Sequence, residues 1–243
     1  MELIPLKQNQ VPSHRLTALL KTEQPHHMTH GEALYIIWKF INPDKYWHKQ
    51  EVKPYVWDIR PLDDTIFQVM FSSIHKGDTV RFMETLEHMG GSFTTEKGDR
   101  YLIREAEYLP DVPCTGDPIQ IVSYNGCQCF RKIGDPESEK KRHYRIVNAM
   151  NDPKLFSKKI TNALVARAKR FFPNATEETD ASKVRMRFIF PTAPVSPVHY
   201  QGADILTQFV SFQLIAPPAI QKTALYGGIG KEPSSGFGFV LPV

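Results

Sequence analysis

Apolar and polar residues recur with two distinct periods along this chain of 243 residues. The clearest helical period runs over residues 29–42, where one broad apolar face is formed by Ala33, Leu34, Ile36, Ile37, Phe40 and Ile41. Thr29 and Glu32 match a capping box, and Asn42-Pro43 ends the pattern. We therefore predict a helix over residues 29–42, with Thr29 as its N-cap and His30 as its first residue.

The rest of the first half predicts one more helix and four strands. Alternation and turn residues place the strands at 2–8, 54–60, 65–73 and 100–105, and helical spacing places the helix at 79–89. The resulting order is β-α-β-β-α-β, which is the ferredoxin-like plan.

The second half repeats this plan. Strands are predicted at 119–124, 184–190, 205–215 and 239–243, and helices at 139–150, 154–172 and 218–226. Three prolines between residues 110 and 118 mark a linker. We therefore predict an α+β protein of two tandem ferredoxin-like (RRM-like) domains, 1–110 and 111–243. The second domain carries a basic helical insertion at about residues 135–172.

Charge is unevenly distributed although the net charge is only +4. Residues 131–170 hold twelve Lys or Arg and four Asp or Glu, a net charge of +8, so the rest of the chain is −4. Such segregation favours an anionic polymer as partner, with a solvated helix face as the alternative.

Composition narrows the class of protein further. No run of 18 apolar residues occurs, and the N-terminus lacks the pattern of a signal peptide. The three cysteines, Cys114, Cys127 and Cys129, form no CxxC motif. We expect a cytoplasmic protein with reduced thiols and with no membrane span, bound metal or cofactor.

The chain ends in a glycine-rich segment, GGIGKEPSSGFGFVLPV, with the pairs Gly228-x-Gly230 and Gly236-x-Gly238. A helix precedes it and a strand follows it, the reverse of a dinucleotide fingerprint, and Lys231 is not followed by the Ser or Thr of a P-loop. Its backbone N–H groups can bind an anion such as a phosphate. A tight helix-to-strand connection explains the glycines equally well.

Taken with the topology, this tail resembles the signature loop of CRISPR-associated RAMP proteins, most of all the repeat-processing endoribonucleases of the sixth Cas family. The stretch LIAPPAIQKTALYGGIGKEPSSGFGFVLPV is similar to the end of the subtype I-E enzymes, and THGEALYIIWKFINP, PYVWDIR and TIFQVMFSS resemble their first half. The basic helical segment resembles the helical finger of type IV enzymes, which is the branch we favour.

The resemblance implies a defined reaction. Such enzymes bind the hairpin of precursor CRISPR RNA and cut once at its 3′ base. The adjacent ribose 2′-OH attacks without a metal, leaving a 2′,3′-cyclic phosphate and a 5′-OH. Many members stay bound to the hairpin in an effector complex with other Cas subunits.

This reaction needs a base, an acid and positive charge near the phosphate. The resemblance implies a catalytic histidine on or near the first helix, and this chain has His26, His27 and His30 there. The positive end of the helix dipole favours a neutral His30 that can accept a proton. His30 is the first candidate for the base and His27 the second. Local packing or capping is the alternative role for His30, and a solvated position is the alternative for His26 and His27.

Other side chains are candidates if no histidine acts. Arg15 and Arg60 are the arginines that can replace a histidine, as in some members of the family, and Tyr35 can orient RNA or donate a proton, although a helical tyrosine is more often structural. For RNA binding we predict the basic residues of the second domain and the polar residues of the terminal loop, together with Arg60: Arg131, Lys132, Arg142, His143, Arg145, Lys158, Lys159, Arg167, Lys169, Arg170, Gly228, Gly230, Lys231, Ser234, Ser235, Gly236 and Gly238.

Two other functions share part of this pattern. A non-catalytic RAMP subunit that binds guide RNA has the same tail, and the histidine cluster favours an enzyme over it. A plain RNA-binding protein with tandem ferredoxin-like domains does not need the glycine loop. A metal-dependent nuclease is disfavoured, because the adjacent carboxylates Asp63 and Asp64 fit a turn.

Overall fold

The chain divides into two compact units, which are described separately. The computed structural model describes residues 11–41, 53–133, 144–189, 193–200, 202–231 and 233–243. The N-terminal unit consists of Met1–Pro113 together with Ser234–Gly236, and the C-terminal unit consists of Cys114–Pro233 and Phe237–Val243. Three residues of the glycine-rich segment therefore belong to the N-terminal unit.

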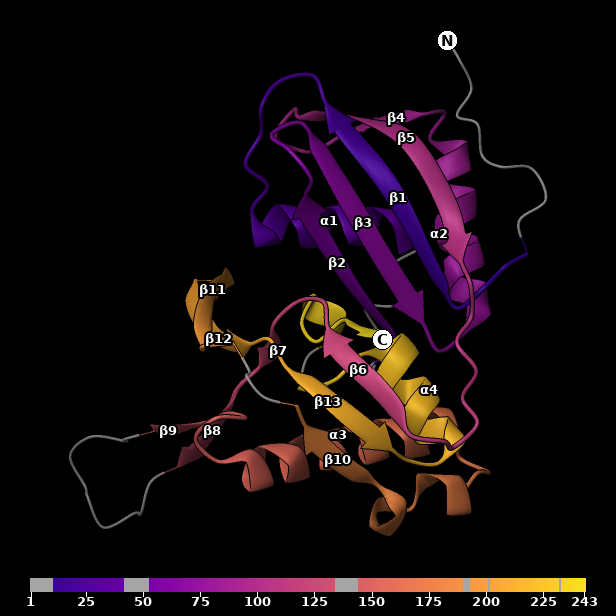
Figure 1. Cartoon of the computed structure of the whole chain (residues 1–243). Helices are drawn as coiled ribbons and strands as arrows, with labels where there is room; N and C mark the ends of the chain where they lie inside the picture. The colour runs from indigo at the N-terminus through magenta and orange to yellow at the C-terminus, as the bar shows by residue number, and fades with distance from the viewer. Residues whose placement is uncertain (1–10, 42–52, 134–143, 190–192, 201, 232) are drawn as a thin grey trace. The chain divides into compact units, whose positions relative to one another are not determined.

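The N-terminal unit is one antiparallel sheet with two helices on one face (Figure 1). Its strands follow the order β2-β3-β1-β5-β4. The elements are β1 (Arg15–Thr22), α1 (His30–Ile41), β2 (Tyr55–Pro61), β3 (Ile66–Ser73), α2 (Lys76–His88), β4 (Ser92–Thr94) and β5 (Arg100–Leu109). Apart from the added edge strand β4, this is the predicted β-α-β-β-α-β plan.

An aromatic core joins the helices of this unit to its sheet. The ring of Phe82 on α2 lies 5.0 Å from that of Phe40 on α1 and 4.9 Å from that of Phe71 on β3. All three side chains are fully buried. The apolar face predicted for residues 29–42 is confirmed, because Ile36, Ile37 and Phe40 show no exposed surface.

The first strand of this sheet was not predicted. Residues 2–8, where a strand was expected, lie outside the described residues, and β1 takes the central position between β3 and β5. The adjacent Leu19 and Leu20 obscure the alternation in the sequence, although burial alternates along β1. The pairing of β1 with β5 shifts register between these two residues because it passes over Arg104, so the irregularity lies in β5.

The C-terminal unit contains a second antiparallel sheet in the order β10-β13-β6-β14. Helices α3 and α4 contact each other and complete a second β-α-β-β-α-β plan (Figure 1). The elements are β6 (Ile119–Ser123), α3 (Pro153–Phe171), β10 (Arg185–Phe188), β13 (Ser211–Ile215), α4 (Pro218–Gly227) and β14 (Val240–Pro242).

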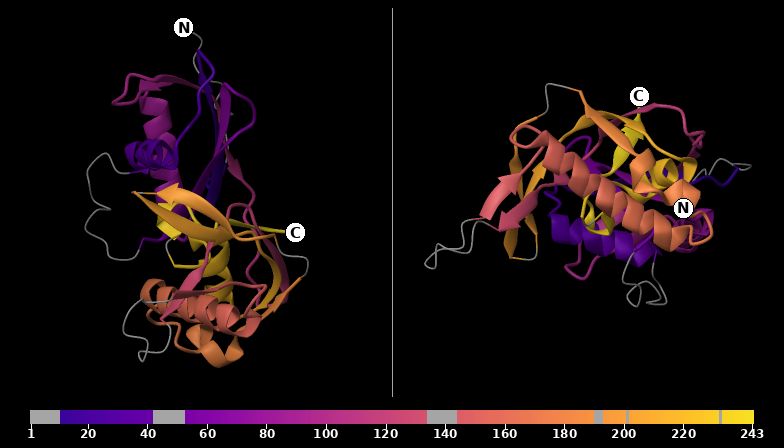
Figure 2. Two further views of the ribbon diagram at one scale, coloured as in Figure 1. Left: turned by 90° about the vertical axis from the view of Figure 1, so that its left-hand side faces the viewer. Right: turned by 90° about the horizontal axis from the view of Figure 1, so that it is seen from below.

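Shorter elements extend this unit. Three strands form a sheet in the order β11-β12-β7, and two form a ladder ahead of α3 (Figure 2). These strands are β7 (Cys127–Gln128), β8 (Phe130–Ile133), β9 (Tyr144–Val147), β11 (Ser196–Tyr200) and β12 (Ala203–Gln208), and the 3₁₀ turns are η2 (Glu177–Thr179), η3 (Ala181–Lys183) and η4 (Pro233–Ser235).

The basic segment is only partly helical. The prediction of a helix over residues 139–150 is wrong for Tyr144–Val147, which form β9 and pair with β8, and residues 139–143 lie outside the described part. Tyr144, Ile146 and Val147 are residue types that favour a β-strand once a partner strand is present. The helix predicted at 154–172 is confirmed as α3, which is capped by Asp152, whose carboxylate accepts a hydrogen bond from the Leu155 backbone N–H at 3.1 Å.

The long strand predicted at residues 205–215 is two strands in different sheets. β12 ends at Gln208 and β13 begins at Ser211. Between them, the Val210 backbone N–H donates to Ser123 Oγ at 2.7 Å, so the chain is bound to the end of β6 where it changes sheets. The run of apolar residues across this point hides the break. No helix in the described part of the chain has the length and apolar character needed to cross a membrane.

Candidate active site

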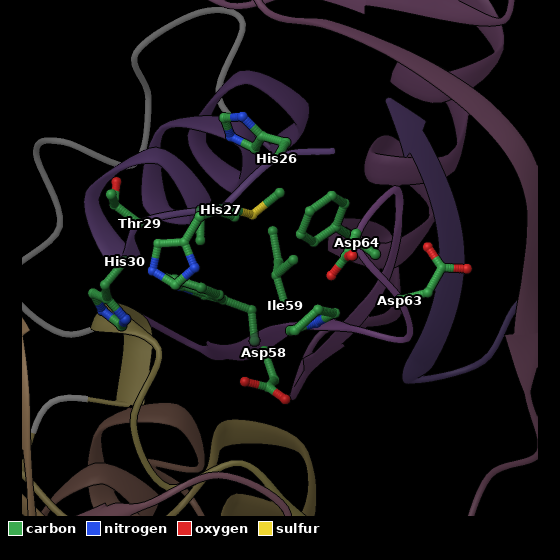
Figure 3. Close-up of a pocket in the computed structure, with 13 residues that line it drawn as sticks. His26, His27, Thr29, His30, Asp58, Ile59, Asp63 and Asp64 are labelled. Atoms are coloured by element: carbon green, nitrogen blue, oxygen red, sulfur yellow. The ribbon is translucent and has the colours of Figure 1, made fainter. Parts of the chain in front are cut away.

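A cavity of about 330 Å³ in the N-terminal unit is lined by the segment that leads into α1 and by β2 (Figure 3). His27, Thr29 and His30 come from the first of these segments, and Asp58 and Ile59 from the second. Asp63 and Asp64 lie at the turn after β2 and also line it. His26 lines it as well, so the cavity brings together all three histidines of the cluster and several carboxylates.

Thr29 caps α1 as the sequence predicts, whereas the Glu32 carboxylate of the predicted capping box bonds His26 and Tyr101. Thr29 Oγ1 accepts a hydrogen bond from the Glu32 backbone N–H at 3.3 Å, and the Thr29 carbonyl oxygen accepts one from Ala33 N–H at 3.0 Å. His30 is consequently the first residue of the helix. At this position its side chain lies beside the positive end of the helix dipole.

His30 is held by contacts on its ring face and on one ring nitrogen. Its ring stacks on Trp57 of β2, with 5.4 Å between centroids and 29° between planes. Its Nε2 lies 2.7 Å from the carbonyl oxygen of Ser235, and Trp57 Nε1 donates to the carbonyl oxygen of Ser234 at 2.9 Å. Two neighbouring aromatic side chains thus bind consecutive carbonyl groups of the glycine-rich segment.

This hydrogen bond determines which nitrogen of His30 can act as a base. A carbonyl oxygen only accepts, so Nε2 carries the hydrogen and Nδ1 is the basic nitrogen of the neutral ring. Burial lowers the pKa of His30 below its ordinary value and outweighs the opposing effects of the Ser235 hydrogen bond and the Asp58 charge. Near pH 7 the imidazole is therefore neutral and can accept a proton at Nδ1.

Gly236 permits the close approach of the loop to these two rings. Its φ is +84°, and a Cβ at this position would lie 2.7 Å from atoms of the Trp57 ring and 3.0 Å from His30 Cε1. Gly238 has a φ of +72°, and its Cβ would overlap the carbonyl oxygen of Ile229. The terminal glycines are therefore required by close packing as well as by backbone conformation.

The other two histidines of the cluster have different surroundings. His27 is exposed and lines the same cavity as His30. His26 is half-buried, its backbone N–H donates to the Asp64 carbonyl oxygen at 2.8 Å, and its Nε2 lies 2.9 Å from Glu32 Oε1. His27 is thus open to solvent, whereas His26 is tied to α1.

The remaining catalytic candidates do not line this cavity. Arg15 is buried on β1, and its guanidinium donates to the carbonyl oxygen of Pro110 at 2.9 Å. Tyr35 lines a separate cavity of about 210 Å³. Arg60 Nε is 3.2 Å from the carboxylate of Asp58, which does line the His30 cavity. Arg60 is therefore linked to the site through Asp58.

The adjacent residues Asp63 and Asp64 lie in the turn after β2, and the Asp63 carboxylate stabilises this turn. Asp63 Oδ1 accepts hydrogen bonds from Thr65 N–H and Ile66 N–H, both at 2.7 Å, and from the Thr65 hydroxyl at 3.0 Å. These bonds to the ionised form lower the pKa of Asp63. This is the turn role predicted for the pair.

The predicted RNA-binding residues are distributed over several elements of the C-terminal unit. Lys158, Lys169 and Arg170 are exposed on α3, and Lys159 is half-buried there. Arg131 and Lys132 lie on β8, with Lys132 opposite Arg145 of β9. Arg142 and His143 lie outside the described residues. In the loop, Lys231 is exposed and Gly228 and Gly230 are buried.

Arg167 differs from the expected surface cation. Only 8% of the residue is exposed, and its guanidinium donates to the carbonyl oxygens of Gly227 and Gly228, the latter at 2.9 Å. Burial lowers its pKa to about 10, so it stays charged at neutral pH. It neutralises the C-terminal end of α4 and holds the start of the glycine-rich segment.

Sequence reasoning missed Trp57 and Asp58 as parts of the site. Residues 54–60 were predicted as a strand, which is correct, but alternation along a strand does not reveal which aromatic ring will meet a distant loop. The separation of Trp57 from Ser234 by 177 residues explains why no local signal identifies the contact.

Comparison with known proteins finds a match to a Cas6 family model and similar folds among Cas6-related and RAMP structures. Residues 127–241 match the family model described as CRISPR associated protein Cas6, C-terminal. No curated protein sequence matches the chain. The fold is similar to that of a Cas6-related protein from Pyrococcus furiosus, with a TM-score of 0.74 at 14% identity, covering 95% of this chain and 98% of that one.

Two further solved structures share the fold. One is described as a RAMP protein binding different RNA substrates, with a TM-score of 0.72 at 11% identity, covering 94% of this chain and 99% of that one. The other is Cse3 from Thermus thermophilus bound to an RNA representing a pre-cleavage complex, with a TM-score of 0.53 at 9% identity, covering 95% and 100%.

Proposed function

We propose that this chain, a Cas6-like protein by the family match of residues 127–241 and by its fold, is an endoribonuclease that processes CRISPR repeat RNA. The observation that carries the proposal is the setting of His30. It is the first residue of a helix, its pKa is lowered by burial, and its Nε2 is oriented by the Ser235 carbonyl oxygen. These features suit a general base.

In the proposed reaction, Nδ1 of His30 takes the proton of the ribose 2′-OH next to the scissile phosphate. The 2′ oxygen forms a bond to phosphorus and the bond to the 5′ oxygen breaks, so the products are a 2′,3′-cyclic phosphate and a 5′-OH. His27, exposed in the same cavity, can donate the proton that the leaving 5′ oxygen needs. No step requires a metal ion.

The exposed cations of the C-terminal unit supply a binding surface for the phosphates of a repeat hairpin. Lys158, Lys169 and Arg170 project from α3, and Lys231 projects from the glycine-rich segment. An A-form stem is recognised mainly through its shape and phosphate positions, which suits such a set of cations. We propose that the hairpin stays bound after cleavage and that the protein then joins an effector complex with other Cas subunits.

The branch of the family is a separate matter. The type IV assignment drew on a helical finger, and the first half of that segment contains β9 where a helix was predicted. The basic content of residues 131–170 still favours that branch, which stays a prediction.

The test is cleavage of the end-labelled repeat RNA of the protein's own locus in the presence of EDTA. We expect one cut, a cyclic phosphate on the upstream product, and no cut when the ribose at the cleavage site is 2′-deoxy. His30→Ala should abolish cleavage while retaining RNA binding. His88→Ala is the matched control, because His88 is exposed on α2 and its Nδ1 lies 2.6 Å from the Glu84 carbonyl oxygen of the same helix.

The same experiment separates the alternatives. Tight hairpin binding by the parent protein without any cut would contradict the enzyme and leave a guide-RNA-binding RAMP subunit. Unchanged cutting by His30→Ala would move the base to another group, with His27 and Arg60 the next residues to replace.

A further inference from the structure

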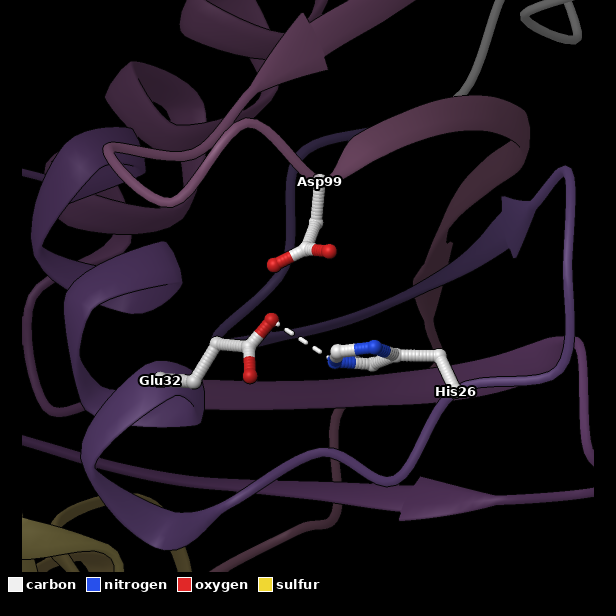
Figure 4. Close-up of side chains that lie close together, drawn as sticks. All are labelled: His26, Glu32 and Asp99. Carbon is white, nitrogen blue, oxygen red and sulfur yellow. Dashed lines mark hydrogen bonds and ion pairs between the residues drawn. The ribbon is translucent and has the colours of Figure 1, made fainter.

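A second group of titratable side chains lies beside the His30 cavity and shares one lining residue, His26, with it. His26, Glu32 and Asp99 point toward one another from three separate segments: the loop before α1, the first turn of α1 and the turn between β4 and β5 (Figure 4). One nitrogen or oxygen atom from each residue lies within 4.8 Å of the others. An imidazole and two carboxylates form a donor set that Zn²⁺ and similar divalent ions bind.

Charge in this cluster is not balanced by lysine or arginine. The Glu32 side chain is 4% exposed, and within the described part of the chain it pairs with His26. Neither Glu32 nor Asp99 pairs with a lysine or arginine in that part, and Arg100 pairs with Glu23 at 3.3 Å. Two carboxylates in a partly buried site favour a bound cation.

The cluster is also built to hold the Glu32 carboxylate in place. The Tyr101 hydroxyl donates to Glu32 Oε1 at 2.6 Å. Such an outer hydrogen bond orients a carboxylate ligand in metal sites.

Space for an ion and its water ligands adjoins the cluster. A cavity of about 260 Å³ is lined by His26 and Asp99 together with Gln24, Pro25 and Arg100. Ligands about 2 Å from a tetrahedral zinc ion lie roughly 3.3 Å apart, so modest rotations of the three side chains suffice. A solvent molecule from this cavity can complete the coordination.

We propose that His26, Glu32 and Asp99 bind a divalent transition-metal ion, with Zn²⁺ the best match, and that the ion fixes the loop before α1 to the β4–β5 turn. The site is structural and separate from the RNA reaction proposed above, in which no metal takes part. Because His27 follows His26 directly, the ion would stabilise the loop that lines the His30 cavity.

The test uses the tag-free full chain, stripped with EDTA, then dialysed and titrated with ZnCl₂ by calorimetry and with CoCl₂ by visible absorption. We expect one ion per chain and a Co²⁺ spectrum of a four-coordinate site. Asp99→Asn and His26→Gln should each weaken binding at least tenfold. Glu96→Gln, an exposed carboxylate of the same turn, should bind like the parent.

Stability provides a second measurement, since an ion that binds only the folded chain raises the unfolding temperature. Added Zn²⁺ should raise it in the parent and in Glu96→Gln and leave Asp99→Asn unchanged. The proposal is overturned if the parent binds no ion, or if Asp99→Asn and His26→Gln bind it as tightly as the parent. RNA is absent from these assays, so their outcome is independent of the proposed nuclease activity.

Discussion

The rings of His30 and Trp57 stack 5.4 Å apart, and their nitrogens bind the neighbouring carbonyl groups of Ser235 and Ser234. The two rings are therefore positioned together: Trp57 packs against one face of the imidazole, and the loop orients both rings through its carbonyl groups. Because one backbone segment binds both side chains, we expect a change in Trp57 or in the loop to alter the position of the His30 ring.

Replacing Trp57 by Phe should slow cleavage by about tenfold to a hundredfold with little loss of RNA affinity. The variant retains a stacked ring but loses the Nε1 hydrogen bond, so the loop and His30 are less well positioned. The loss of folding stability should be about 1 kcal/mol. Single-turnover rates, filter binding and thermal unfolding measure the three quantities. An unchanged rate would show that the Ser234 contact does not matter for catalysis.

Cleavage should depend on pH through His30. Its pKa lies below the ordinary histidine value, and a base acts only when unprotonated, so the rising limb of the pH–rate profile should have its midpoint below pH 6.5, and the proposed acid, His27, limits the rate at higher pH. Stability should follow the same direction: neutral His30 is favoured by the folded state, so stability falls as pH drops from 6.5 through the folded pKa. A rate still rising well above pH 7 would argue against His30 as the base.

Gly236→Ala should reduce both stability and cleavage. The methyl group meets Trp57 and His30, and the positive φ adds strain of about 1–2 kcal/mol. Gly90→Ala is the control for backbone strain without a steric clash, because Gly90 has a φ of +62° and open space where a Cβ would be. We expect Gly90→Ala to lose similar backbone energy and to cut at the normal rate. Equal cleavage by the two variants would contradict a role for close packing at Gly236.

Arg167→Met should destabilise the C-terminal unit by about 3 kcal/mol. Its removal leaves the carbonyl oxygens of Gly227 and Gly228 without their charged donor in a buried place. Lys169→Met, on the exposed side of the same helix, should change stability by less than about 0.5 kcal/mol. Urea unfolding of both variants gives the comparison, and similar midpoints would mean that Arg167 is not holding the loop.

RNA affinity should fall steeply with salt if the exposed cations bind phosphates. With about six contacts, a tenfold increase in salt should cost on the order of five decades of affinity. Replacing both Lys158 and Lys169 by Ala should reduce the slope by about 2 units and leave the sequence preference unchanged. A slope equal to that of the parent would remove these two lysines from the interface.

The sequence by itself determined those features whose causes are local. The helical period and the Thr29 cap define α1, and hence the place of His30 at its first turn. The helix at α3 and the turn at Asp63 follow from capping and from side-chain bonds to nearby backbone. The order of the elements with a regular period also follows, whereas β1, β9 and the break between β12 and β13 were not predicted.

Tertiary structure alone decided which distant groups meet. A partner strand turned Tyr144–Val147 into β9, and burial against the end of α4 made Arg167 a support of the loop in place of a surface cation. The contacts of His30 with Trp57 and Ser235, and of Glu32 with Tyr101, join segments that carry no mark of each other in the sequence. Burial and hydrogen bonding across such separations depend on the packed fold, and these same contacts set the protonation and orientation of the proposed catalytic histidine.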